Sequence, residues 1–383
     1  MSAIYLDHNA TTPPTAEVTA AVCDTLSHCW GNASSAHAIG AESKRRLVRA
    51  RAQVAALLGA APAELVFTSG ATESNHLAIL GALAAQPGKT HIVSSAVEHP
   101  ATLGLLGHLE RSGFAVTRLA VDGAGRLDPA QIDAALRPDS ALLSLMWANN
   151  ETGALFPVAE AARIARARGV LFHSDAVQAV GRQDVDVRRI PVDLLSLSAH
   201  KLHGPPGIGA LFVRKGLALP PLLFGHQERR RRGGTENLPG IVGFGVAAEQ
   251  AAQNWRTDAT RVRALRDLFE QQLTQHLPGV RINAAAAERL PNTSNFAIGA
   301  IDSEIILERL DRAGVCASSG SACTAGGTEP SHVLRAMGQS PQAALAALRF
   351  SLGSGNTAAE IRRVLALLSD IVTPLLQEAA AAA

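Results

Sequence analysis

The chain has 383 residues, of which 47% are hydrophobic and 18% charged, a composition typical of a globular protein with room for about two domains. The formal net charge of +2 is too close to zero to favour nucleic acid or an anionic membrane as the main partner. No basic segment followed by an apolar run opens the sequence and no apolar stretch could span a bilayer, so we expect a cytoplasmic protein.

Between about residues 64 and 216, short apolar segments alternate with segments of helical character. The apolar segments predict buried strands, and their alternation with helices predicts a mostly parallel sheet covered on both faces. One predicted helix opens with Asp128 and Pro129, residue types suited to an N-cap and a first helical position. The predicted strands, some with the loop that follows, are 64–70, 91–100, 114–122, 141–150, 170–178, 192–201 and 209–216, and the predicted helices are 71–85, 101–113, 128–136 and 157–169.

The pattern changes after about residue 240. Apolar residues recur at helical spacing over 246–276, which predicts one long helix. Shorter predicted strands and helices follow it to the C-terminus. We therefore expect a second, smaller α+β domain after the alternating region.

Polar side chains gather where the predicted strands end. Ligands of parallel α/β sheets bind at the carboxyl ends of the strands, so these side chains are expected at one rim. The turn at Gly70 offers backbone N–H groups of a helix N-terminus beside hydroxyls, which suits a phosphate, although many such turns bind nothing. The strand ends carry Ser69, Ala71, Thr72, Glu98, His99, Asn149, Asn150, Glu151, Asp175, Gln178, Ser198, His200 and Lys201.

Three of these polar residues are candidates for chemistry, each with a plainer alternative. Lys201 follows an apolar strand, where desolvation would lower its proton affinity and allow a Schiff base, whereas most lysines lie at the surface. Asp175 suits a cationic ring nitrogen or else caps a turn. His99 suits stacking on a flat ring or proton transfer, or is an ordinary loop histidine.

The chain has four cysteines, at positions 23, 29, 316 and 323. None belongs to a CxxC pair, so we expect neither a metal site nor a disulfide framework. Cys323 stands among glycines and small polar residues, which predicts a flexible loop with an exposed thiol, whereas Cys316 is expected in an apolar strand. The run 229–232 of four arginines is either a solvated loop or part of a dimer interface.

Several longer motifs carry a resemblance to a known family. They occur in order from Leu6 to Leu352, so the resemblance covers nearly the whole chain. The sequence resembles the cysteine desulfurase family, in particular the NifS/IscS group, and two of the motifs are most similar to NifS-type sequences. The motifs are LDHNATT, TSGATESN, EHP, WANNETG, HSDAVQAVG, LSAHKLHGP, RRGGTEN, SSGSACTAG, EPSHVLRAMG and RFSL.

The resemblance implies a fold-type-I enzyme that depends on pyridoxal 5'-phosphate (PLP) and forms a homodimer. Its large domain, expected at 14–257, would be an α/β unit with a mostly parallel, seven-stranded type of sheet that binds PLP. The smaller α+β domain, expected at 1–13 and 258–383, would carry the loop of the catalytic cysteine. The implied reaction converts L-cysteine to L-alanine and leaves a persulfide, whose sulfur passes to an iron–sulfur scaffold protein.

The resemblance also implies catalytic and substrate-binding residues. Lys201 would hold PLP as a Schiff base, and His99 would stack on the PLP ring. Cys323 would be the nucleophile that accepts sulfur. Asn150 and Arg349 would hold the carboxylate of the substrate. Arg349 has the planar fork that suits a carboxylate, although an ordinary salt bridge is its plainer alternative.

The remaining implied residues bind the cofactor. Asp175 would pair with the ring nitrogen, and Gln178 would contact the phenolic oxygen of the ring. Thr235 would reach the phosphate of the cofactor in the other subunit. Around the phosphate of the same subunit, the implied residues are Ala71, Thr72, Ser198 and His200.

Two other readings remain open. Another fold-type-I enzyme, such as a selenocysteine lyase or an aminotransferase, would use Lys201 and Asp175 without needing Cys323. A degenerate assembly partner would have no activity at all, which the presence of the full set of candidate residues argues against.

Overall fold

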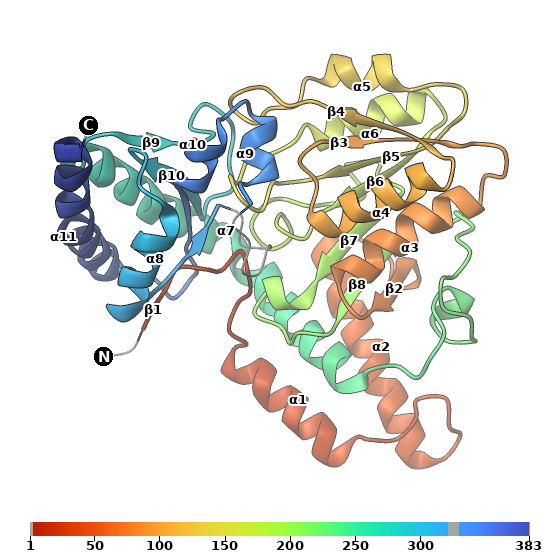
Figure 1. The fold of residues 1–383 in the computed structure, drawn as a ribbon. Coiled ribbons are helices and arrows are strands. Elements are labelled where there is room, and N and C mark those ends of the chain that lie inside the picture. The colour runs from red at the N-terminus through yellow and green to blue at the C-terminus, as the bar shows by residue number, and fades with distance from the viewer. Residues whose placement is uncertain (1–2, 321–328, 383) are drawn as a thin grey trace.

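The computed structural model describes residues 3–320 and 329–382, so Cys323 lies outside the described residues. The chain forms two groups of elements, a larger one around a seven-stranded sheet and a smaller one that holds both ends of the described chain (Figure 1). Over these described ranges, no helix combines the length and the apolar character needed to cross a membrane.

The large sheet confirms the predicted fold class. Its strand order is β2-β8-β7-β6-β5-β3-β4, and every neighbouring pair is parallel except the two that involve β8. A loop of ten residues, too short for a crossover helix, joins β7 to β8, so β8 returns antiparallel. The strands are β2 (Leu65–Thr68), β3 (His91–Ser95), β4 (Ala115–Leu119), β5 (Ser140–Met146), β6 (Leu171–Asp175), β7 (Leu194–Ser198) and β8 (Gly209–Val213).

Helices cover both faces of this sheet, which explains the nearly continuous apolar strands. Along β5, Leu142 packs in one core with α3 and α4, whereas its neighbour Leu143 packs in the other core with α2 and α6. The cap of α5 is as predicted, because the Asp128 side chain accepts a hydrogen bond from the Ala130 N–H. The helices are α1 (Ala16–His28), α2 (Ala38–Leu58), α3 (Ala71–Ala84), α4 (Pro100–Arg111), α5 (Pro129–Ala135) and α6 (Val158–Ala167), with short 3₁₀ turns η1 (Pro62–Glu64), η2 (Ala199–Lys201) and η3 (Glu228–Arg230).

The long helix α7 (Leu238–His276) begins earlier than the sequence pattern predicts. The Asn237 side chain caps its N-terminus by accepting from the Gly240 N–H. Glycines over 240–245 weaken the helical signal, yet they are needed for packing. A Cβ on Gly245 would lie 2.8 Å from the Cα of Ala50 on α2. The early part of α7 thus packs closely on α2.

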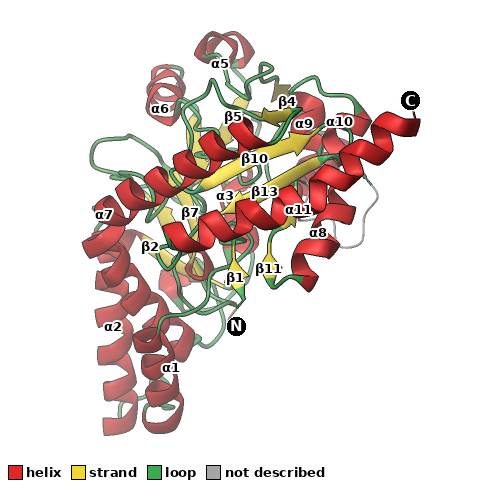
Figure 2. Ribbon diagram, turned by 90° about the vertical axis from the view of Figure 1, so that its left-hand side faces the viewer, coloured by secondary structure: helices red, strands yellow, loops and turns green. Residues whose placement is uncertain are grey.

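The smaller group has its own core. Here α7 and α11 cover one face of a four-stranded antiparallel sheet of order β12-β13-β10-β9 (Figure 2). The N-terminal strand β1 pairs in parallel with β11, which contains Cys316 as expected. The elements are β1 (Ile4–Tyr5), β9 (Val280–Ile282), β10 (Thr293–Ile298), α8 (Ser303–Arg312), β11 (Val315–Cys316), β12 (Ser318–Ser319), α9 (His332–Ala336), α10 (Pro341–Leu345), β13 (Ala347–Ser351) and α11 (Ala358–Ala382).

Helix α7 contributes to both cores. Phe244 packs with the core of the large sheet, whereas Val262 and Phe269 pack with the smaller one. The N-terminal residues Ile4 and Leu6 also belong to the smaller core. The division at 14–257 therefore stays a prediction, drawn through the middle of one continuous helix.

Candidate functional site

The sequence-predicted residues converge on one cavity of about 480 Å³. It lies where β3, β5, β6 and β7 end, together with residues from α3 and β13. This is the rim at which parallel sheets bind ligands. Of the predicted site residues, those that line it are Ala71, Thr72, His99, Asn150, Asp175, Gln178, Ser198, His200, Lys201 and Arg349.

Lys201 ends the 3₁₀ turn η2, directly after β7. Its half-buried side chain donates hydrogen bonds from Nζ to the carbonyl oxygens of Asn9 at 2.5 Å and Ala10 at 2.6 Å. The backbone of the N-terminal segment thus orients the amine. Sequence reasoning did not include Asn9 or Ala10 in the site, although both lie in the LDHNATT motif.

Asp175, the last residue of β6, is buried and held by neutral donors. Oδ2 accepts from the Asn75 side chain at 2.7 Å, and Oδ1 accepts from the Val177 N–H at 3.0 Å. Asn75 lies on α3, one turn after the Gly70 turn. Because two donors fix both oxygens, the carboxylate keeps one orientation in the cavity.

His99 caps helix α4 at the wall of the same cavity. Its Nδ1 accepts from the Ala101 N–H at 3.2 Å, so a neutral ring carries its proton on Nε2. Burial lowers the pKa of His99, opposed by the nearby Asp175 charge and reinforced by the charge of Lys201. The ring is therefore neutral at pH 7.

The turn before α3 provides the features of an anion site. Gly70 is the N-cap of α3 and makes no side-chain cap hydrogen bond, and a Cβ added there would meet nothing within 4 Å. Thr72, Ser198 and His200 add side-chain groups around it. Burial, with the nearby charges of Lys201 and Arg182, lowers the pKa of His200 to about 4, so His200 is a neutral hydrogen-bonding group here.

Arg349 offers a buried cation to the cavity from β13. Its side chain is 1% exposed, and it donates to the Asp7 carboxylate at 2.7 Å and to the Asn150 carbonyl at 3.2 Å. Its Nε–H is buried and has no hydrogen-bond partner within the described part of the chain. A buried unpaired donor of this kind suits a ligand carboxylate.

Two buried carboxyl groups, Glu98 and Glu151, flank the site, and the sequence did not indicate that their pKa values are raised. Burial raises the pKa of Glu98 to about 8, although Ser95 and the Met146 N–H donate to its Oε1. Burial also raises the pKa of Glu151 to about 7, against the opposing effects of Ser331 and Arg349. At neutral pH Glu98 is therefore mostly uncharged.

One predicted residue, Thr235, lies away from this cavity, and another, Cys323, lies outside the described residues. Thr235 lines a separate cavity of about 200 Å³ that also contains Arg232 and Glu236. Its predicted contact involves a second subunit, so the position of Thr235 in one chain leaves that prediction open. Cys323 falls in the gap between the described ranges, and its role stays a prediction.

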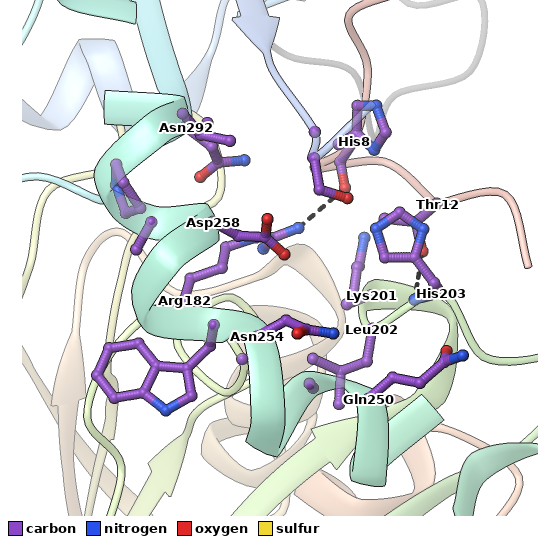
Figure 3. Close-up of a pocket in the computed structure, with 18 of the residues that line it drawn as sticks. His8, Thr12, Arg182, Lys201, Leu202, His203, Gln250, Asn254, Asp258 and Asn292 are labelled. Atoms are coloured by element: carbon purple, nitrogen blue, oxygen red, sulfur yellow. Dashed lines mark hydrogen bonds between the residues drawn. The ribbon is translucent and has the colours of Figure 1, made fainter. Parts of the chain in front are cut away.

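A second cavity of about 240 Å³ shares Lys201 with the first (Figure 3). Its wall includes His8, Arg182, His203 and Asp258. Burial lowers the pKa of His8 to about 3, with smaller effects from His203 and Arg182. Sequence analysis predicted nothing at this place.

Comparisons with known proteins agree on one family. The profile of the aminotransferase class-V family matches residues 4–364. A cysteine desulfurase of Gluconacetobacter diazotrophicus is 51% identical over 378 residues, covering 98% of this chain and 94% of that protein. A cysteine desulfurase of Cereibacter sphaeroides is 50% identical over 378 residues, covering 98% and 97%.

Solved structures give the same result for the fold. A NifS-like protein superposes with a TM-score of 0.91 at 33% identity, covering 97% of this chain and 99% of that one. A second structure, SspA in complex with cysteine, has a TM-score of 0.81 at 34% identity, covering 92% and 100%.

Proposed function

The chain belongs to the class-V aminotransferase family and is a cysteine desulfurase, and we propose that it works with PLP on Lys201 and a sulfur-accepting thiol on Cys323. The family and its activity rest on relatives about half identical over nearly the whole chain. The observation that carries the residue assignment is the meeting of Lys201, Asp175 and Arg349 at one cavity.

The residues of the cavity fit PLP from end to end. The uncapped N-terminus of α3, with Thr72 and Ser198, suits the phosphate. Asp175, fixed by Asn75 and the Val177 N–H, suits a protonated ring nitrogen. When bound, PLP supplies an electron-accepting ring that stabilises negative charge at the substrate Cα.

The residues around the substrate have separate tasks. Arg349 and Asn150 hold the carboxylate and so orient the Cα–H bond. The amine of Lys201 would take the Cα proton as a general base. Neutral His99 covers the ring and excludes water.

Cys323 would take the sulfur. Its thiolate attacks the sulfur of the substrate, an S–S bond forms, and the C–S bond breaks with its electron pair going to carbon. A proton added to that carbon, together with the return of a proton to Cα, would give alanine, and the persulfide would stay on the protein. An iron–sulfur scaffold protein is the proposed acceptor, and a homodimer the proposed assembly, in which Thr235 would reach the neighbouring site.

Two variants test the assignment. Lys201→Ala is expected to lose both the absorption band of lysine-bound PLP and alanine formation from L-cysteine. Cys323→Ala is expected to keep the band and to lose persulfide formation, with Cys23→Ala as the matched control because Cys23 is exposed on α1. Alanine release from L-cysteine by Cys323→Ala at the wild-type rate would refute Cys323 as the nucleophile. If that variant released alanine from selenocysteine as fast as the wild type or faster, a selenocysteine lyase would be favoured.

A further inference from the structure

Arg182 lies outside the predicted site, yet it contacts a residue inside it. The side chain lines the second cavity and extends beside Asp258 toward the backbone of His8 (Figure 3). It donates from Nη1 to the Gln178 side-chain oxygen at 2.6 Å and to the Gln178 carbonyl at 3.2 Å, and from Nη2 to the His8 carbonyl at 3.2 Å. Arg182 therefore joins the turn after β6 to the N-terminal segment.

These contacts fix the orientation of the Gln178 amide from both sides. A guanidinium can only donate, so the amide atom that faces Arg182 must be Oε1. On the other side, Nε2 donates to the Asn9 carbonyl at 3.0 Å, and a carbonyl can only accept. Gln178 lines the main cavity, and since Arg182 engages Oε1 and the Asn9 carbonyl takes one hydrogen of Nε2, the second N–H of Nε2 is the amide donor left for a ligand there.

The same carbonyl anchors the lysine. The Asn9 oxygen also accepts from Nζ of Lys201, so the Gln178 amide and the Lys201 amine share one acceptor. Asn9 is 1% exposed, and its side chain donates to Thr293 and accepts from Asn292. The acceptor cannot move to follow a turned amide without disrupting these buried bonds.

The side chain of Arg182 stays charged although it is partly buried. Burial, with a smaller contribution from the Arg349 charge, lowers the pKa of Arg182 to about 10. The guanidinium thus stays protonated at neutral pH, and its N–H groups remain available to Gln178.

We infer that Arg182 is a positioning residue that keeps the amide N–H of Gln178 directed into the cofactor cavity. The inference rests on the proposed function, because it takes the phenolic oxygen of PLP as the acceptor of that N–H. A donor at this oxygen favours its ionised form and so lowers the pKa of the protonated lysine–cofactor linkage. Without Arg182 only the Asn9 carbonyl still selects this orientation, so the turned amide becomes more populated and the pKa of that linkage rises.

The test is a pH titration of the absorption band of the lysine-bound cofactor, with the holoenzyme and its variants. We expect Arg182→Met to raise the apparent pKa by about one unit, since one charge-assisted hydrogen bond is lost. Arg182→Lys, which keeps the charge and a donor, is expected to shift it less. Arg168→Met is the matched control, because Arg168 is exposed and pairs with Asp133 far from Gln178.

A double-mutant cycle separates amide orientation from simple loss of charge. In a Gln178→Leu background, Arg182→Met is expected to add little further shift. An equal shift in both backgrounds would show that Arg182 acts only through its charge and would overturn the inference. So would an unshifted titration in Arg182→Met, or in Arg182→Ala if the methionine variant fails to fold. If the wild-type protein has no such band, the cofactor assignment itself fails, which is a different result.

Discussion

Glu98 is expected to make the stability of the protein fall as pH rises. Its carboxyl group is 1% exposed, and Oε2 has no hydrogen-bond partner among the residues that the structure describes. Burial, the largest cause, raises its pKa from the ordinary 4.5 to about 8, with the Asp175 charge adding to the rise. Replacing Glu98 by Gln keeps the shape and the acceptor Oε1 while removing the ionisable group.

The size of the effect follows from this pKa difference. Below pH 4.5 the carboxyl group is protonated in both states and has no effect. Between pH 4.5 and about 8 it is ionised only in the unfolded state, so the unfolding free energy of the wild type falls with rising pH. The slope is about 1.4 kcal/mol per pH unit, and the loss reaches about 5 kcal/mol above pH 8 as an order of magnitude.

Urea unfolding of wild type and Glu98→Gln at pH 5 to 8 measures this difference, at fixed protein and cofactor concentrations. The stability of the variant relative to the wild type should increase steadily across that range. The matched control is Glu110→Gln, because Glu110 is exposed and its pKa is lowered by Arg118. If the unfolding free energies of the wild type and Glu98→Gln differ by the same amount at pH 5 and pH 8, burial does not raise the pKa of Glu98 as argued.

Further predictions concern the substrate and cofactor contacts. Arg349→Lys should raise the KM for L-cysteine at least about tenfold, because lysine lacks the planar fork, while the absorption band of lysine-bound PLP stays normal. An unchanged KM would show that Arg349 does not bind the substrate. Asn75→Leu should weaken PLP retention during dialysis, because the Asp175 Oδ2 loses its donor; equal retention would show that the Val177 N–H alone fixes the carboxylate. Asn9→Ala should lower the unfolding free energy, measured by urea titration, by about 3 kcal/mol, because three buried side-chain hydrogen bonds are lost. A decrease below about 1 kcal/mol would show that these three bonds do not stabilise the fold as expected.

Much of the site was predictable because it follows from local pattern and one topological rule. Strand segments such as 170–178 end in a polar residue, and parallel strands place their carboxyl ends at one edge. Asp175 and Lys201 could therefore be grouped before any coordinates were known. The motifs that resemble cysteine desulfurases added Arg349, which lies outside the large sheet and which strand order alone would not bring there.

The rest depends on contacts between residues far apart in the chain. Asn9 reaches the site because its backbone N–H bonds to Ser351, a partner 342 positions away, and no local pattern indicates that pairing. The altered pKa of Glu98 depends on how completely the folded chain covers it. The early start of α7 was hidden because glycines such as Gly245, which serve packing, have low helix propensity.

The most direct test of the proposed chemistry is mass spectrometry of the peptide that contains Cys323, after brief exposure of the PLP-loaded protein to L-cysteine. We expect one additional sulfur atom on Cys323, formed together with alanine, and none in Lys201→Ala. Alanine formation with the extra sulfur on Cys316 or Cys23, or with no protein-bound sulfur, would contradict the proposed sulfur transfer.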